Sequence, residues 1–211
     1  VAVTTGVGNT LVGGLAGDAI TTGEENSALG YGALGANTTG TANVAFGHDA
    51  LAANTTAGSN SALGREALKA NTTGANNTAV GKRALYTNST GTQNTAVGAA
   101  SLSSNTTANN NAALGYEALR DNTTGASNTA IGHNSMVVNS TGPNNTAVGY
   151  LSLSANTTGS ENNALGYGAL YLNTTAQNNN AFGTLALGAN TTGAGNTAMG
   201  GNTLDANTTG S

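Results

Sequence analysis

The chain of 211 residues contains no cysteine, no tryptophan and one proline, and only 7% of its residues are charged. The absence of cysteine excludes disulfides and thiolate metal sites. Ordinary soluble domains carry about 25% charged residues, so the few charges here exclude disorder of the polyelectrolyte kind. A net charge of −4 offers no basic surface for phosphates, which predicts no nucleic-acid partner. No run approaches about 18 apolar residues, so we predict no membrane span.

What the chain has instead is a repeat of 17 residues that never slips. Numbered from its first Asn, the average unit reads N-T-A-Φ-G-x-x-A-L-x-A-N-T-T-G-x-x, where Φ is a large apolar residue. Positions that stay constant through the chain are expected in the core or at sharp turns, and variable positions in water. The twelve units, the last of which lacks one residue, begin at Asn9, Asn26, Asn43, Asn60, Asn77, Asn94, Asn111, Asn128, Asn145, Asn162, Asn179 and Asn196.

This pattern predicts an all-β fold, a parallel β-solenoid (β-roll) with 17-residue coils and about twelve rungs. A helical repeat is disfavoured because every unit carries Gly, Asn and paired Thr at fixed places. We expect two short strands per coil, in T-A-Φ-G and in A-L-x-A, with corners at the fifth-position Gly and at Asn-Thr-Thr-Gly. At about 4.8 Å per rung, twelve coils make a rod roughly 58 Å long.

Alternation within these strands predicts which side chains face inward. We expect Φ and the ninth-position Leu to fill a narrow core, and the small residues at the third and eighth positions to face outward. A smooth strip of Ala and Ser could then pack against the same strip on a second or third chain. The alternative is that alternation breaks near Gly and that both small residues line the core. The sequence leaves these two interpretations open.

The two ends of the repeat array differ from its middle. In the first unit Gly17 replaces Leu and Ile20 replaces Asn. We therefore divide the chain into a degenerate first coil at 1–25, which is a candidate cap, and regular coils at 26–211. The last unit stops at Ser211 without a visible cap, so we expect either that the native molecule continues past this residue or that chains associate there end to end.

The corner segment Asn-Thr-Thr is also an acceptor motif for N-linked sugar. Eleven sugars spaced about 4.8 Å apart along one edge would collide. We instead predict a structural corner ladder, in which stacked Asn amides bond from coil to coil. Its members are Asn37, Asn54, Asn71, Asn88, Asn105, Asn122, Asn139, Asn156, Asn173, Asn190 and Asn207.

Little in the sequence indicates chemistry. The segment GYGALG at 30–35 matches G-x-G-x-x-G, but the same register reads GREALK at 64–69. No helix follows to hold a pyrophosphate, so we expect no cofactor. His48 and His133 lie five coils apart, about 24 Å, and cannot share a metal. The carboxylates are scattered, which predicts no metal site. No nucleophile stands beside a base, so we expect no catalytic residue and no enzyme activity.

Tyr150, Tyr167 and Tyr171 are a candidate surface contact. Tyr150 and Tyr167 hold the exposed sixth position on adjacent coils, with Tyr171 nearby, and such rings can stack on sugars or on a partner. The alternative is that Tyr serves as a good strand former on an exposed strand. Glu66 and Arg83 hold the same position on neighbouring coils, which predicts a surface ion pair contributing at most about 1 kcal/mol.

The unit, with cores such as Asn145-Thr146-Ala147-Val148-Gly149, resembles the repeats of phage tail fibres and bacterial surface fibres. It is similar to the motif of head domains in trimeric autotransporter adhesins, which are parallel β-rolls of three chains that hold to surfaces. The resemblance implies self-association as a homotrimer, an extracellular, cell-surface or virion location, and a surface glycan or receptor as partner. The adhesin-head repeat is shorter than 17 residues, so only the general roll architecture is carried over.

We therefore predict a non-enzymatic structural fibre or adhesin segment, a rigid rod that presents side chains. The rival is an ice-binding β-solenoid. Its flat face would be an Asn/Thr grid at the corner, such as Asn71/Thr73 over Asn88/Thr90. Against ice binding, corners built from Gly and Asn are seldom flat.

Overall fold

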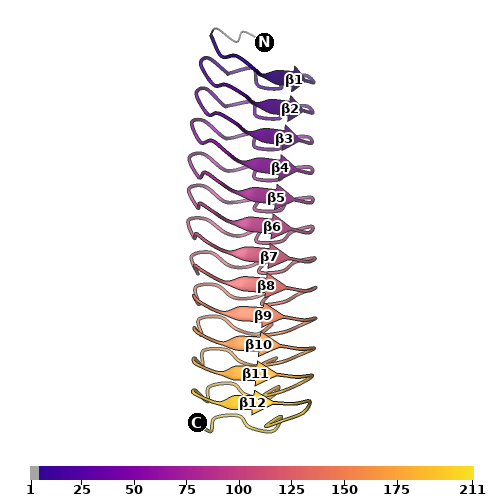
Figure 1. The fold of residues 1–211 in the computed structure, drawn as a ribbon, viewed down its shortest axis with the longest axis vertical. Helices are drawn as coiled ribbons and strands as arrows, with labels where there is room; N and C mark the ends of the chain where they lie inside the picture. The colour runs from indigo at the N-terminus through magenta and orange to yellow at the C-terminus, as the bar shows by residue number, and fades with distance from the viewer. Residues whose placement is uncertain (1–4) are drawn as a thin grey trace.

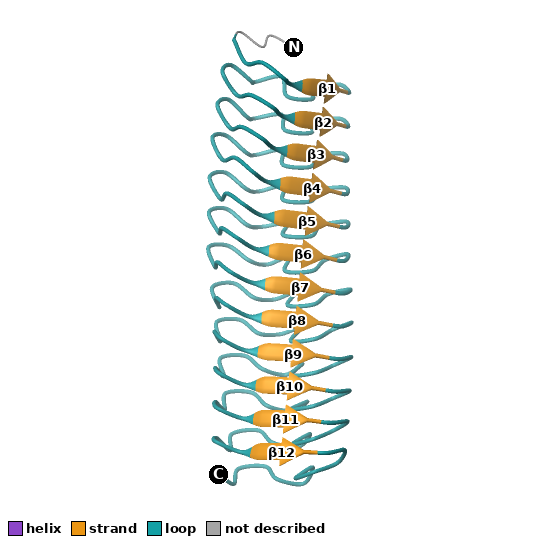
Figure 2. Cartoon of the chain, in the orientation of Figure 1, coloured by secondary structure: helices purple, strands orange, loops and turns teal. Residues whose placement is uncertain are grey.

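The computed structural model describes residues 5–211, which form a straight rod of stacked coils (Figure 1). Each coil contributes one three-residue strand, and the strands lie side by side along the rod (Figure 2). They are β1 (Thr10–Val12), β2 (Ser27–Leu29), β3 (Val44–Phe46), β4 (Ser61–Leu63), β5 (Thr78–Val80), β6 (Thr95–Val97), β7 (Ala112–Leu114), β8 (Thr129–Ile131), β9 (Thr146–Val148), β10 (Asn163–Leu165), β11 (Asn180–Phe182) and β12 (Thr197–Met199).

All twelve strands belong to one parallel sheet in chain order. The register pairs equal positions of adjacent coils, for example Ala113 of β7 with Ala130 of β8. The structure therefore confirms the prediction of an all-β parallel solenoid with 17-residue coils.

The second strand expected in each coil, at A-L-x-A, does not form, so the prediction of two strands per coil is wrong. This segment is a run of turns, in which the seventh and ninth positions adopt left-handed backbone conformations, for example Glu66 (φ 60°) and Leu68 (φ 51°). An extended strand needs negative φ and cannot continue through these residues. Hydrogen bonds still join the coils here, since the Leu68 amide donates to the Ala84 carbonyl over 3.0 Å.

Glycine at the fifth position ends every strand, and stacking leaves no room there for any other residue. Gly98 has a φ of 134°, and a Cβ on it would lie 2.3 Å from the carbonyl oxygen of Gly115 on the next coil. The corner therefore needs glycine for two reasons: the backbone angle is one that glycine adopts readily, and the backbone of the next coil lies too close for a side chain. Both requirements explain why the fifth position is Gly in every unit.

The core consists of the small residues and the ninth-position Leu. In one representative coil Ala113, Ala118 and Leu119 are all buried. The Φ side chains lie instead on the outer face of the sheet, so the prediction that Φ faces inward is wrong. Of the two interpretations left open for the Ala and Ser residues, burial of both is correct, and residues 5–211 form no Ala/Ser surface strip. The coil is so narrow that one Leu fills the space beside two small residues.

The first coil stacks on the second in the common register, although its sequence differs. Leu11 stands where other coils have Ala, and Gly17 stands where they have Leu or, in one coil, Met136. A Cβ on Gly17 would lie 2.7 Å from Leu11 and 2.9 Å from Ile20. These two side chains therefore fill the space that Leu occupies elsewhere. Residues 1–4 of the unit assigned to 1–25 lie outside the described residues.

Candidate functional site

The corner Asn residues form a hydrogen-bonded ladder along one edge of the rod. The Asn54 side-chain amide donates to Oδ1 of Asn37 over 2.9 Å and to the Ala57 carbonyl over 3.0 Å. The bond between successive Asn residues recurs at every step up to Asn207. The ladder members from Asn37 to Asn190 are fully buried.

This burial removes two of the roles that the sequence offered for the corner. An enzyme cannot reach a buried amide that is already hydrogen-bonded, so the motifs from Asn37 to Asn190 are not accessible for glycosylation in the folded rod. The Asn/Thr grid expected for ice binding is also wrong, because Asn71 and Asn88 are fully buried. In the corners from Asn37 to Asn190 only the second Thr of the triplet, such as Thr73 and Thr90, is exposed.

A second ladder, which sequence analysis missed, runs through the first-position Asn residues; we call it the strand-entry ladder. The Asn43 backbone amide donates to Oδ1 of Asn26 over 3.1 Å, and its side-chain amide donates to the Ala57 carbonyl over 2.9 Å. The Ala57 carbonyl therefore accepts from both ladders. The sequence carries a signal for this ladder, since the first position is Asn in every unit.

An exposed apolar ridge follows the outer face of the sheet, on the side chains of the Φ position. Ile131 is 38% exposed, Leu114 49% and Met199 73%, where a buried core residue would be near zero. The ridge is continuous, because strands pair in register and each contributes one member. Its members are Val12, Leu29, Phe46, Leu63, Val80, Val97, Leu114, Ile131, Val148, Leu165, Phe182 and Met199.

An aromatic column flanks this ridge across the glycine corner, at the sixth position of four successive coils. Its ring centroids are 5.1 Å apart between Tyr116 and His133, 5.3 Å between His133 and Tyr150, and 5.7 Å between Tyr150 and Tyr167. His48 stacks on Tyr31 in the same way near the other end of the rod. The two histidines thus serve as stacking partners in separate places.

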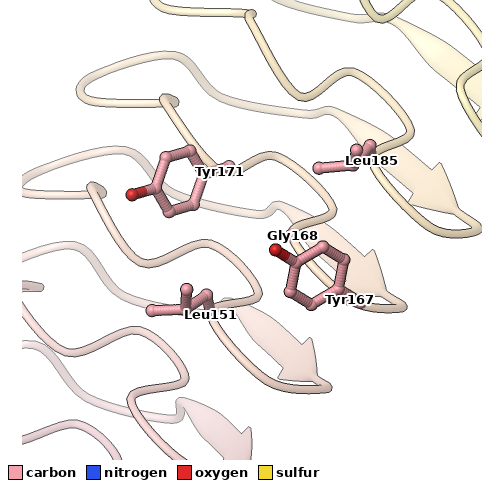
Figure 3. Close-up of a pocket in the computed structure, with 5 residues that line it drawn as sticks. All are labelled: Leu151, Tyr167, Gly168, Tyr171 and Leu185. Carbon is pink, nitrogen blue, oxygen red and sulfur yellow. The ribbon is translucent and has the colours of Figure 1, made fainter.

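A pocket of about 210 Å³ opens beside the last ring of this column (Figure 3). We call it the tyrosine pocket; its lining residues are Leu151, Tyr167, Gly168, Tyr171 and Leu185. Two of the three tyrosines named from the sequence, Tyr167 and Tyr171, lie in it. Tyr150 stacks behind Tyr167 and does not line the pocket. The two leucines and the glycine were missed, because the seventh position had been treated as freely variable.

The ion pairs lie on coils away from this pocket. Arg83 Nε lies 2.7 Å from the Glu66 carboxylate, which confirms the predicted ion pair, and the hydrogen bond from Arg83 lowers the pKa of Glu66. Lys69 joins Asp49 over 3.0 Å. Arg65, Lys69, Arg83 and Arg120 each have a carboxylate within 4 Å, so these groups balance one another locally.

Within residues 5–211 no group of three or more His, Asp or Glu side chains could hold a metal ion. The same part of the chain contains no helix that is long and apolar enough to cross a membrane. Comparison with protein-family models, with curated proteins and with solved structures finds no match. The surfaces described above must therefore support any statement of function by themselves.

Proposed function

We propose that the chain is a non-enzymatic structural rod, a segment of an extracellular fibre or adhesin on a cell surface or virion, and that it self-associates laterally as a homotrimer through the apolar ridge. The single observation that carries the proposal is the ridge itself. Soluble monomers rarely expose a continuous apolar surface of this length. The resemblance of the repeat to trimeric adhesin heads supports an assembly of three chains.

The geometry favours other copies of the same chain as the partner. The strands that carry the ridge form one continuous column from end to end of the rod (Figure 1), so parallel copies related by rotation about a common axis present it to each other along its whole length. Three such ridges converge on one axis and are removed from water together. The partner surface expected from the sequence, an Ala/Ser strip, is buried inside each coil, and the ridge takes its place in the proposal.

The energetics require contact over most of the rod. The ridge side chains are already about half buried, so covering the remainder contributes on the order of 1 kcal/mol per coil. Twelve coils together give a sum of the same order as the entropy cost of association, about 4–15 kcal/mol. A few coils in contact would not hold the chains together. The assembled species should therefore be aligned in register from end to end.

Sedimentation equilibrium and light scattering test this proposal. We expect the native chain to have about three times its mass of 20.3 kDa and an elongated frictional ratio. The double variant Leu114→Thr, Ile131→Thr keeps good strand formers on the sheet and should weaken association at least tenfold. Leu172→Thr removes an exposed leucine outside the ridge and should leave association unchanged. A native chain that stays a monomer, or a ridge variant that assembles as tightly, would contradict lateral association.

Ice binding is the second candidate function, and one observation still favours it. The second Thr of the corner is exposed in every coil, for example Thr56, Thr73 and Thr90, which gives a regular column of hydroxyl and methyl groups. A single column lacks the second dimension that a flat ice-matching face needs. Thermal hysteresis separates the two functions: we expect none at millimolar protein, whereas a clear freezing-point gap that is lost in Thr73→Lys would establish ice binding and displace the fibre proposal.

A further inference from the structure

We propose that the tyrosine pocket binds one neutral hexopyranose ring of a surface glycan. The inference rests on the proposed function in one respect: if the rod is an adhesin segment, the hexopyranose is the chemical group through which it would attach to a surface. It concerns a single pocket on coils nine to eleven, and it does not require the rod to trimerise.

The shape of the pocket comes from one break in a column of side chains. Leu151, Gly168 and Leu185 hold the seventh position of three successive coils, so the two leucines stand two rungs apart, about 10 Å. Gly168 has no side chain, which leaves a gap that the Leu185 side chain covers on one side, since a Cβ on Gly168 would lie 2.7 Å from Leu185 Cδ2. Tyr167 and Tyr171 stand on either side of the gap (Figure 3). The volume of about 210 Å³ lies below the roughly 300–1,000 Å³ of sites for drug-sized ligands. The pocket therefore accommodates a single ring.

The lining chemistry selects the class of ring. The leucine methyls and the tyrosine faces are apolar, which matches the C–H face of a pyranose, and the two phenol hydroxyls can donate to or accept from sugar hydroxyls. No charged side chain lines the pocket, so an acidic sugar gains no ion pair there. A purely apolar ligand would leave the phenols without a specific partner.

The pocket is also held in shape before any ligand arrives. Tyr167 stacks on Tyr150 with a centroid distance of 5.7 Å and an angle of 15° between the rings. The Tyr171 backbone amide donates to the Gly168 carbonyl over 3.2 Å. Rigid walls lower the ordering cost of binding.

The pocket stays open when the ridge is covered. Its residues stand at the sixth, seventh and tenth positions, beyond the glycine corner that separates them from the fourth-position ridge. The second coil provides an internal comparison: Tyr31 and Gly32 repeat the Tyr–Gly pair, but Gly35 stands where Tyr171 supplies the second ring.

Saturation-transfer difference NMR tests the proposal with three probes: methyl β-galactopyranoside, methyl α-glucopyranoside and glycerol. A ligand of one ring in a shallow pocket should have a dissociation constant on the order of millimolar. We expect saturation of the ring C–H protons of at least one hexoside, and none for glycerol, which has hydroxyls without a ring face. No transfer to either hexoside at about 10 mM, or equal transfer to glycerol, would overturn the proposal.

Variants locate the site. Tyr171→Ser places at the tenth position a residue that Ser103 and Ser154 already hold there, and it should weaken binding at least tenfold. Tyr86→Ser, at the same position of another coil, is the matched control and should bind as the native chain does. Gly168→Leu should close the pocket: Leu151 and Leu185 already adopt the same left-handed conformation, and the new Cβ, 2.7 Å from Leu185 Cδ2, would push that side chain aside; Gly32→Leu is its control.

Circular dichroism checks that Tyr171→Ser and Gly168→Leu keep the native fold. If Gly168→Leu does not fold, Tyr171→Ser alone tests the site. Binding that persists in Tyr171→Ser would contradict the site. The oligomer experiment is independent: a monomer that binds the hexoside overturns only the trimer, and a trimer that does not bind it overturns only the pocket.

Discussion

At the scale of single residues, the buried amide is the unusual component of this rod. A buried polar group is costly unless its hydrogen bonds are made. Each corner Asn satisfies this condition only through its neighbours. Asn105, for example, donates to Asn88 over 2.7 Å and to the Ala108 carbonyl over 3.1 Å, and it accepts from Asn122 over 3.1 Å. Loss of one amide therefore leaves groups on adjacent coils unpaired.

We expect Asn105→Ala to lower the free energy of unfolding by about 2–3 kcal/mol, because Oδ1 of Asn88 remains buried without its donor. Urea unfolding followed by circular dichroism measures the loss. Thr107→Ala is the matched control, since Thr107 is exposed in the same corner, and it should cost no more than about 0.5 kcal/mol. Equal losses for the two variants would show that the ladder contributes little beyond turn propensity.

At the scale of elements, the sequence predicted the coil and its corners but not the direction of the strand side chains. Alternation over a three-residue strand shows that Ala and Φ lie on opposite faces, and it does not show which face is inside. Hydrophobicity favoured Φ inside. In a 17-residue coil, however, the wall opposite the strand already supplies Leu119 or its equivalent, and only Ala fits beside it.

The missing second strand has a related cause. The ninth-position Leu adopts a left-handed conformation, as in Leu119 (φ 56°), which costs roughly 1–2 kcal/mol for a residue with a Cβ. Full burial of the leucine side chain contributes about 1.5–3 kcal/mol and offsets this cost. Single-residue propensity cannot reveal such a balance, because burial is fixed only when the coil closes.

The candidate site was predictable only in part for the same reason. Tyr167 and Tyr171 could be found from the sequence because aromatic side chains are rare in this chain. The gap between them depends on Gly168, one glycine among 32. Its meaning comes from the leucines 17 residues before and after it. Comparing one position through successive coils would have shown the pattern Leu–Gly–Leu.

At the scale of the whole molecule, twelve parallel strands stack in chain order into one elongated rod (Figure 1). Side-chain ladders are one of the devices that stabilise sheets of many strands. Here two Asn ladders run along the rod and meet at shared carbonyls such as that of Ala57. The same register at every step lets one ridge and one aromatic column follow the axis.

A stack of equivalent coils should tolerate loss of a complete coil better than loss of half of one. Deletion of residues 94–110 removes one coil without ion pairs and brings β5 against β7 in the common register. Stability in such arrays is approximately a sum over repeats and their interfaces, so we expect a small decrease in melting temperature and a rod shorter by about 5 Å.

Deletion of residues 94–102 removes fewer residues, but it forces the remaining eight residues of that coil out of the stack as a loop. The loop adds closure entropy, and the corner Asn105 loses its place in the ladder. Thermal unfolding and small-angle scattering compare the two variants. The smaller deletion should melt at the lower temperature, and losses that simply scale with the number of residues removed would show that the rod does not behave as a stack of independent coils.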